Sequence, residues 1–135
     1  MTLTEEEESL PRPRGILSLQ TIAMPRDANP HGDIFGGWLV SQMDLAASVA
    51  ARKRARGRAT TVAIDAMVFL RAVSVGDLVA FYTDIQSIGR SSMKILVEVW
   101  SVSDQLETRT KLTEGLFTFV AIDESGRTRA LPPLN

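Results

Sequence analysis

Residues 36–56 read GGWLVSQMDLAASVAARKRAR, and no other part of the 135-residue chain has so clear a helical pattern. Apolar side chains point in nearly every direction around the axis of a helix built from this segment. A helix of that kind has to be covered by other parts of the protein on most of its sides. We therefore predict one central helix, at about Gly36 to Arg56, with the remaining chain arranged around it.

The remaining chain has the pattern of strands, with β-branched and alternating apolar residues separated by turn residues. The expected strands are Ile16–Ala23, Ala59–Leu70, Val75–Ile88, Ser91–Val102 and Thr108–Ile122. Turns are expected at Gly76-Asp77 and from Asp123 to Gly126. Five strands and one apolar helix predict an α+β fold in which an antiparallel sheet curls around the helix.

Composition excludes several classes of function. The net charge of −1 gives no overall attraction for a nucleic acid, so no nucleic-acid partner is expected. The absence of cysteine removes disulfides, thiolate metal ligands and any cysteine nucleophile. With His31 as the single histidine, a histidine-rich zinc site is also excluded, and we expect no metal site. The length suits one domain with a substantial core.

The N-terminal region is acidic over Glu5–Glu8 and contains Pro11 and Pro13, which is the opposite of a secretory signal peptide. We expect a flexible tail over residues 1–14 and a single domain over residues 15–132. The longest apolar stretch, Leu45–Ala51, is far too short to span a bilayer. These features predict a cytoplasmic protein that has no membrane partner.

A polar loop that begins near Asp27 enters the helix through Gly36 and Gly37. The first N–H groups of a helix have no partner inside the helix, and the helix dipole favours negative charge there. Two glycines let a ligand come close to this backbone. With Asn29 before the glycines and Asp44 after them, the segment has the components of an acyl-transfer site.

Asp44 is the candidate catalytic base. It lies about two turns inside the apolar run, where a charge is costly unless it is paired or used. One interpretation is structural: the carboxylate faces a solvent strip or a neighbouring subunit, or bonds to Ser41 or Ser48. The other interpretation is a desolvated carboxylate that takes a proton from water. Both remain open at this level.

Asn29 is the candidate partner of Asp44. An Asn before Pro30 is commonly a turn residue, but its amide could also hold a water molecule or a carbonyl oxygen. Asp44 lies about 12 Å along the helix from Gly36, so the loop would have to fold back to reach it in the same chain. Meeting the Asp44 of a second chain is simpler. We therefore predict a site shared across a dimer interface.

A basic cluster ends the helix and comprises Arg52, Lys53, Arg54, Arg56 and Arg58. It could pair with the helix dipole or bind phosphate, but it lies about 25 to 30 Å from the glycines. It could therefore serve a site at the glycines only from another subunit.

Arg71 and the hairpin residues Gly89, Arg90, Ser91 and Ser92 are better placed to face a ligand, although a hairpin turn alone explains the glycine and serines. The role of His31 stays open between a surface residue and a catalyst.

Nine motifs in order resemble those of the hotdog-fold acyl-CoA thioesterases of the YciA and cytosolic acyl-CoA hydrolase type. They are Asp27-Ala28-Asn29, Gly32, Phe35-Gly36-Gly37, Met43-Asp44, Phe69-Leu70-Arg71, Val75-Gly76-Asp77, Ile88–Ser92, Glu98-Val99-Trp100 and Arg129-Ala130-Leu131-Pro132. The resemblance runs from about Leu17 to Pro132. It implies the hotdog fold, in which a five-stranded curled antiparallel sheet wraps around one long central helix.

The resemblance also implies an activity, the hydrolysis of acyl-CoA to a free carboxylic acid and CoA with no metal or other cofactor. It implies a homodimer that assembles into a hexamer as a trimer of dimers. Carried over to this chain, Asp44 activates water, Asn29 of the neighbouring subunit positions it, and the N–H of Gly37 polarises the thioester carbonyl. The resemblance also implies residues that bind the substrate, close to the glycines or to the CoA moiety. The substrate-binding residues are Gly36, Arg71, Gly89, Arg90, Ser91 and Ser92.

Two alternatives remain. The sequence Asp27-x-Asn29-Pro30-His31 is similar to the signature of hotdog enoyl-CoA hydratases, except that the histidine comes one residue early. That shorter spacing would misdirect one of the two groups that activate water in a hydratase. The other alternative is a non-catalytic domain that binds or senses acyl-CoA, and the presence of both Asn29 and Asp44 argues against it.

Overall fold

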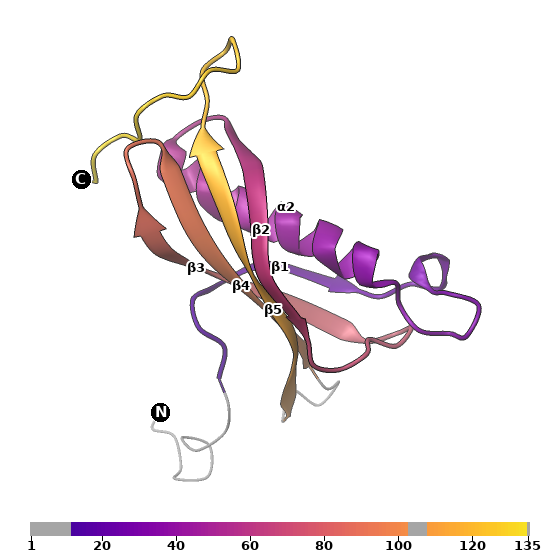
Figure 1. The fold of residues 1–135 in the computed structure, drawn as a ribbon. Coiled ribbons are helices and arrows are strands. Elements are labelled where there is room, and N and C mark those ends of the chain that lie inside the picture. The colour runs from indigo at the N-terminus through magenta and orange to yellow at the C-terminus, as the bar shows by residue number, and fades with distance from the viewer. Residues whose placement is uncertain (1–11, 103–107, 135) are drawn as a thin grey trace, which may run out of the picture.

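The computed structural model describes residues 12–102 and 108–134, and it contains one long helix and five strands (Figure 1). Helix α2 spans Gly36–Ala55, and a short 3-10 turn, η1, spans Pro25–Asp27. The strands are β1 Ile16–Ile22, β2 Ala59–Phe69, β3 Leu78–Ile88, β4 Ser92–Val102 and β5 Arg109–Ala121. Each predicted helix and strand is confirmed, with ends that differ by at most three residues.

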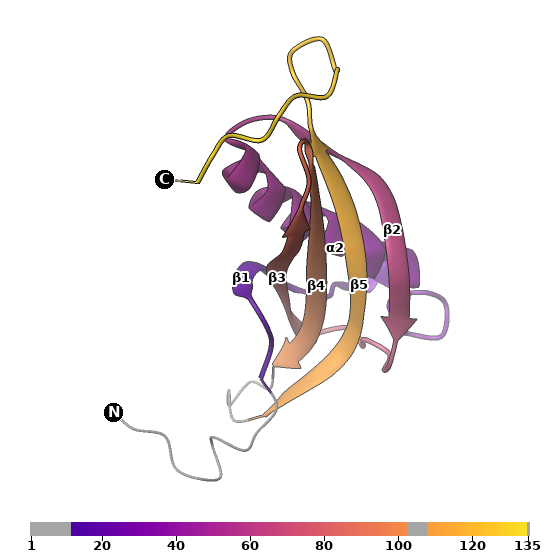
Figure 2. The same ribbon diagram turned by 60° about the vertical axis from the view of Figure 1, so that its left-hand side comes forward.

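The five strands form one sheet in the order β1-β3-β4-β5-β2. Every neighbouring pair is antiparallel, and the sheet curls around α2, which lies across its concave face (Figures 1 and 2). Because β2 follows α2 directly and runs back beside it, the start of β2 lies at the C-terminal end of the helix and Phe69 lies at its N-terminal end. The predicted α+β fold is confirmed.

The core lies between the sheet and one face of the helix. Alternate residues of β4 are completely buried there, and they are Met93, Ile95, Val97 and Val99. The helix supplies small and medium residues at helical spacing, namely Leu39, Met43, Ala46, Ala47, Ala51 and Ala55. Alanines along this face allow the helix to approach the sheet closely, and the rings of Phe81, Phe117 and Phe119 fill the remaining space.

The helix is less covered than its sequence predicts. Within one chain its second apolar face stays open, with Leu45 55% exposed and Val49 38% exposed. The physical reason is that a five-stranded sheet wraps only part of the helix surface. The adjacent edge strand β2 is also apolar on its outside, where Val62 is 56% exposed and Ile64 is 42% exposed. The expectation of a helix covered on most sides is therefore not met inside a single chain.

Helix α2 ends at Ala55 because Arg56 adopts the left-handed conformation, with φ 51°. A side chain from the C-terminal segment then covers this end. The Arg129 guanidinium donates through Nη2 to the carbonyl oxygens of Ala55 at 2.9 Å and Arg58 at 3.3 Å. Its Nε donates to the carbonyl of Ile122 at 2.9 Å. One arginine thus joins the helix end to β5 and the segment that follows it.

We expect Arg129→Ala to lower the free energy of unfolding by about 2 kcal/mol, because the change removes charge-assisted hydrogen bonds to three carbonyls, two of them partly buried. Urea unfolding of the full chain measures the effect. Arg127→Ala is the matched control, since the hydrogen bond of Arg127 to Asp123 uses its main-chain N–H. Equal losses in the two variants would contradict the assigned role.

The predicted turn at 123–126 is confirmed, and Asp123 organises it. Its Oδ1 accepts hydrogen bonds from the hydroxyl of Ser125 and from the main-chain N–H groups of Ser125 and Arg127. The Ser125 hydroxyl, followed by the N–H of Arg127, holds the pKa of the Asp123 carboxyl below its usual value. The turn therefore orders the end of β5 before the chain returns toward Arg129.

Two expectations concern the chain ends and the membrane. Residues 1–11 lie outside the described residues, so the tail over 1–14 and the domain over 15–132 stay predictions. Across residues 12–102 and 108–134, no helix has the length and apolar character needed to cross a bilayer.

Candidate active site

The N-terminus of α2 presents two main-chain donors. Phe35 precedes the helix, and its carbonyl accepts the N–H groups of Trp38 at 3.1 Å and Leu39 at 3.4 Å. The N–H groups of Gly36 and Gly37 come before these and have no acceptor among the described residues. Both glycines are exposed, and a Cβ on Gly37 would meet nothing within 4 Å. This end of the helix can therefore receive an oxygen that carries negative charge.

Asp44 lies half-buried on α2 and is held by a residue of the neighbouring strand. The hydroxyl of Thr61 in β2 donates to Asp44 Oδ1 at 2.5 Å. Neither serine that the sequence suggested is the partner in the described chain, and the Ser41 hydroxyl bonds instead to the carbonyl of Trp38 at 2.8 Å. Asp44 Oδ2 has no hydrogen bond among the described residues, so it is the carboxylate oxygen left without a partner within the chain.

Thr61 is a candidate site residue that the sequence does not mark. It is far from Asp44 in the chain, and one of two adjacent threonines in a strand carries no local sign of this role. The contact exists because β2 returns beside the helix in the antiparallel direction. A hydroxyl that occupies one carboxylate oxygen fixes the orientation of the other, which is how a positioning residue acts.

We expect Thr61→Val to lower kcat by about tenfold with little change in KM, because the variant keeps the shape of the side chain but releases the carboxylate. Thr61→Ser should restore most of the lost rate, since it keeps the hydroxyl. Steady-state kinetics on one acyl-CoA substrate gives both numbers. A fall of the same size in Thr61→Ser would argue that Thr61 acts only through packing.

Asn29 organises its own loop. Its Oδ1 accepts the N–H groups of His31 at 2.9 Å and Asp33 at 3.1 Å, so the turn chemistry considered from the sequence is present. The Nδ2 group makes no hydrogen bond within the described chain and stays available as a donor. The loop projects beyond the N-terminal end of α2, and no hydrogen bond joins Asn29 to Asp44 (Figure 1).

The other loop residues show no catalytic arrangement within one chain. Asp27 Oδ2 accepts the N–H of Met24 at 3.3 Å, and Asp27 Oδ1 lies 4.0 Å from Nε of Arg26. His31 is exposed, and among the described residues its hydrogen bond to Asn29 uses the main-chain N–H and not the imidazole. The structure therefore adds no support for the hydratase signature that the sequence of this loop resembles.

Arg71 lies at the same end of the molecule as the helix N-terminus. It follows Phe69, whose ring is 3.8 Å from the position of a Cβ on Gly36. Arg71 also lines a cavity of about 640 Å³ together with Arg109 and Lys111. Lys111 is oriented there by ion pairs with Glu114 and with the buried Glu98. The sequence does not mark Arg109 and Lys111, because only the pairing of β5 with β2 brings them near Arg71. In that pairing the N–H groups of Leu70 and Arg71 both donate to the carbonyl of Leu112.

The hairpin residues 89–92 lie at the opposite end of the same chain. The N–H of Gly89 donates to the carbonyl of Ser92 at 2.9 Å, which is the hairpin interpretation of these residues. The carbonyl of Ser91 accepts the N–H of Ala121 at the end of β5, and that of Arg90 accepts the N–H of Leu131. A single chain therefore does not bring this hairpin together with Arg71 and the helix N-terminus.

Metal ligands are not gathered in the part of the chain that the structure describes. Across those residues, no group of three or more His, Cys, Asp or Glu side chains could hold a metal ion. The chain places a pair of main-chain donors at the start of α2, with the cationic cavity at the same end of the molecule. The carboxylate held by Thr61 lies about two turns further along the helix.

Comparison with known proteins identifies thioesterases, both by a family model and by individual relatives. The model of the Thioesterase superfamily matches residues 31–108. The acyl-CoA thioester hydrolase YciA of Escherichia coli is 48% identical over 123 residues, which are 89% of this chain and 93% of the relative.

Two solved structures are similar over nearly the whole chain. The hexameric thioesterase y2039 from Yersinia pestis has a TM-score of 0.86 and 46% identity, covering 90% of this chain and 100% of its own. Cj0915, a hexameric hotdog fold thioesterase of Campylobacter jejuni, has a TM-score of 0.82 and 35% identity, covering 90% of this chain and 93% of its own.

Proposed function

This chain belongs to the thioesterase superfamily as an acyl-CoA thioesterase with the hotdog fold, and we propose how its residues hydrolyse the substrate to a carboxylic acid and CoA. The observation that carries the proposal is the arrangement along α2. Two unpaired N–H groups lie at its start, and a carboxylate held by Thr61 lies about two turns further on. We propose that the reaction uses these groups alone, with no metal or cofactor beyond the CoA of the substrate, and that it takes place in the cytoplasm.

We propose that the thioester carbonyl oxygen binds at the N–H of Gly37, with Gly36 lining the same position. Attack on the carbonyl carbon places negative charge on this oxygen, and the helix N-terminus is oriented to stabilise it. One donor of this kind is worth about 3 kcal/mol in the transition state. Glycine at both positions leaves room for the substrate, since a Cβ would project toward the bound carbonyl.

We propose that Asp44 Oδ2 takes a proton from a water molecule as the water oxygen attacks the carbonyl carbon. Thr61 holds Oδ1, so the free oxygen keeps one direction during the reaction. When the tetrahedral intermediate collapses, the bond between carbon and sulfur breaks and the proton passes to the CoA thiolate. The products are the carboxylic acid and the CoA thiol, which accounts for every atom of water and thioester.

We propose that Asn29 acts in the site of the neighbouring subunit. Its Oδ1 is occupied by the N–H groups of His31 and Asp33, so only Nδ2 can contact the reacting groups. Nδ2 is a donor and suits the oxygen of the attacking water or of the carbonyl. The exposed side chains of Leu45 on α2 and of Val62 and Ile64 on β2 support a contact between subunits beside Asp44. The hexameric assembly of y2039 and Cj0915 supports a hexamer here, and we propose that it is built as a trimer of dimers.

We propose that the cavity formed by Arg71, Arg109 and Lys111 takes phosphate groups of CoA. Its position at the helix N-terminal end supports this, because the thioester would be bound at the same end. Guanidinium and ammonium groups provide several donors for phosphate oxygens. In this arrangement Gly89, Arg90, Ser91 and Ser92 contact CoA only from another subunit.

Release of the CoA thiol from a panel of short, medium and long acyl-CoAs tests the activity. Saturable release by the wild-type chain supports the thioesterase. Absence of release from every substrate, with folded protein, would overturn the proposed function.

Mixing two inactive variants tests whether the site is shared. We expect Asn29→Ala and Asp44→Ala each to be nearly inactive alone. When they are unfolded together and refolded as a 1:1 mixture, random pairing makes half of the dimers mixed, and each mixed dimer has one intact site out of two. About a quarter of the wild-type activity should therefore return, as expected for an isologous interface.

The control for this experiment is a 1:1 mixture of the two variants that have each been unfolded and refolded separately. Their subunits have then not exchanged. This mixture should stay inactive. If the co-refolded mixture also stays inactive while wild-type protein recovers its activity after the same treatment, Asn29 and Asp44 act within one chain and the shared site is wrong.

A further inference from the structure

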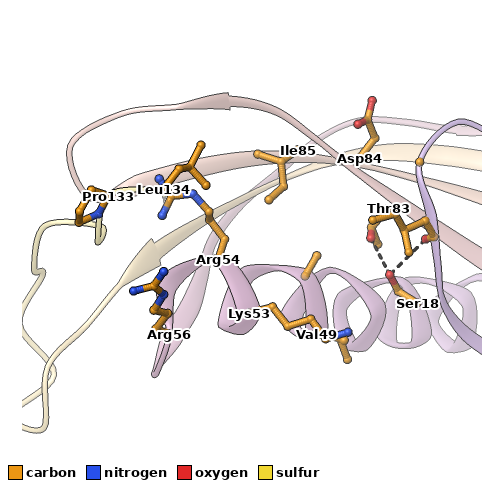
Figure 3. Close-up of a pocket in the computed structure, with 13 residues that line it drawn as sticks. Ser18, Val49, Lys53, Arg54, Arg56, Thr83, Asp84, Ile85, Pro133 and Leu134 are labelled. Carbon is orange, nitrogen blue, oxygen red and sulfur yellow. Dashed lines mark hydrogen bonds between the residues drawn. The ribbon is translucent and has the colours of Figure 1, made fainter.

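A second cavity lies at the C-terminal end of α2, away from the proposed active site (Figure 3). Its volume is about 500 Å³, which is within the usual range of small-molecule sites. The wall is made by the last turns of α2, by the facing parts of β1 and β3, and by residues 133–134. Lys53 is about 25 Å along the helix from Gly36, so this cavity is separate from the glycines of its own chain.

Positive charge gathers on the helix side of the cavity. Lys53, Arg54 and Arg56 all line it, and the one acid in the lining is Asp84. Asp84 already has a partner, because its Oδ2 accepts a hydrogen bond from Gln86 Nε2 at 2.7 Å. Neither Lys53 nor Arg56 has an ion pair among the described residues. The cavity therefore favours an anion.

Arg54 provides the most specific feature. It extends from α2 toward Pro133 and Leu134 of the C-terminal segment (Figure 3). Its Nη1 donates to the carbonyl of the preceding Pro132 at 2.6 Å. Its Nε is enclosed but has no hydrogen-bond acceptor within the described chain. An enclosed donor without an acceptor is unusual in a folded protein, and an oxygen of a bound anion could accept from this guanidinium.

The rest of the lining is largely apolar. Ile16, Val49 and Leu134 line the cavity and are 74%, 38% and 78% exposed in the chain alone. The two hydroxyl groups of the lining, Ser18 and Thr83, satisfy one another across 2.6 Å (Figure 3). Because these hydroxyl groups already have a partner, the part of a ligand that lies beside them needs no polar group. A bound chain of methylene groups would remove the apolar side chains from water.

We propose that this cavity binds a fatty acid of medium or long chain, with its carboxylate beside Lys53 and Arg54 and its chain against the apolar wall. Cations at one side and apolar surface at the other match such an anionic amphiphile. This inference rests on the proposed function in one respect: hydrolysis of an acyl-CoA releases a fatty acid, so the proposed ligand is a product of the enzyme. The cavity thus gives the enzyme a second site where product accumulates, apart from the site where it forms.

Calorimetric titration of the full-length wild-type protein with dodecanoate tests the proposal. We expect saturable binding at this cavity, with Lys53→Gln and Arg54→Gln each weakening the affinity by about tenfold or more. Val49→Trp should abolish this binding by filling the cavity. Arg52→Gln is the matched control: it removes the same charge from the adjacent residue, which does not line the cavity, and should leave affinity unchanged.

Further readouts separate this proposal from the proposed function. Asp44→Ala should lose turnover but keep dodecanoate binding, and Lys53→Gln should keep its kcat while binding weakens. Dodecanol, which lacks the carboxylate, should bind much more weakly than dodecanoate in the wild type. The proposal is wrong if wild-type protein binds no dodecanoate, if Val49→Trp binds it normally, or if saturating CoA displaces it completely.

Discussion

Replacing Asp44 with asparagine is expected to lower kcat by about 10²- to 10⁴-fold while the protein stays folded. The amide has nearly the same shape as the carboxylate and can still accept the Thr61 hydroxyl through its oxygen. It cannot take a proton from water, so the change removes the general base and little else. Thiol release from one good acyl-CoA substrate, measured at saturation, gives the effect on kcat directly.

Two comparisons make the Asp44 result specific. Glu124→Gln removes one negative charge at the turn after β5, at the far end of the fold, and should leave kcat unchanged. Thermal melting of Asp44→Asn should resemble that of the wild type, since Asp44 is only half-buried. If Asp44→Asn retains more than about a tenth of the wild-type kcat, the carboxylate is not the base and its bond to Thr61 is structural.

The largest expected effect on stability comes from Phe117→Ala, which should lower the free energy of unfolding by about 3 to 5 kcal/mol. The Phe117 ring is fully buried on β5, among the residues packed between sheet and helix. Its removal loses the transfer free energy of the ring and leaves a cavity, because β5 is held on both sides by β4 and β2 and cannot move in to fill it. Urea unfolding monitored by circular dichroism measures the loss.

Ile16→Ala is the comparison for Phe117. Ile16 is also a large apolar residue in a strand, but it is 74% exposed at the start of β1. We expect its replacement to change the free energy of unfolding by less than about 1 kcal/mol. Similar losses in the two variants would mean that the core does not lie between the sheet and the helix as described.

The elements of the fold could be predicted because their signals are local. The two glycines at residues 36–37 and the apolar run after them place the start of α2. The alternation through β4 predicts which of its side chains face the core. The prediction that other parts of the chain cover the helix on most sides was only partly correct, since Leu45 and Val49 stay exposed within one chain. An apolar helix surface shows that something covers it, but it does not show whether the cover comes from the same chain or from another.

The candidate site was predictable in part for the same reason. Asp44 is identified by a property of its own segment, namely a charge inside an apolar run. Asn29 is identified by its loop, although the structure shows that its Oδ1 serves the loop itself. The roles of both residues in catalysis remain predictions that the variants described above test. Thr61, Arg109 and Lys111 could not be identified, because nothing in their own segments marks them.

Periodicity and turn chemistry act over a few residues, so the amino-acid pattern is enough to predict the long helix, the five strands, the two glycines at the start of α2 and the acid inside it. Three contacts arise only when the chain is folded: Thr61 meets Asp44, Arg71 joins Arg109 and Lys111, and the hairpin at 89–92 lies at the opposite end. These contacts depend on strand order and register, with β2 placed at the edge beside β5. Strand order follows from how the whole chain buries its apolar surface, which no single segment encodes.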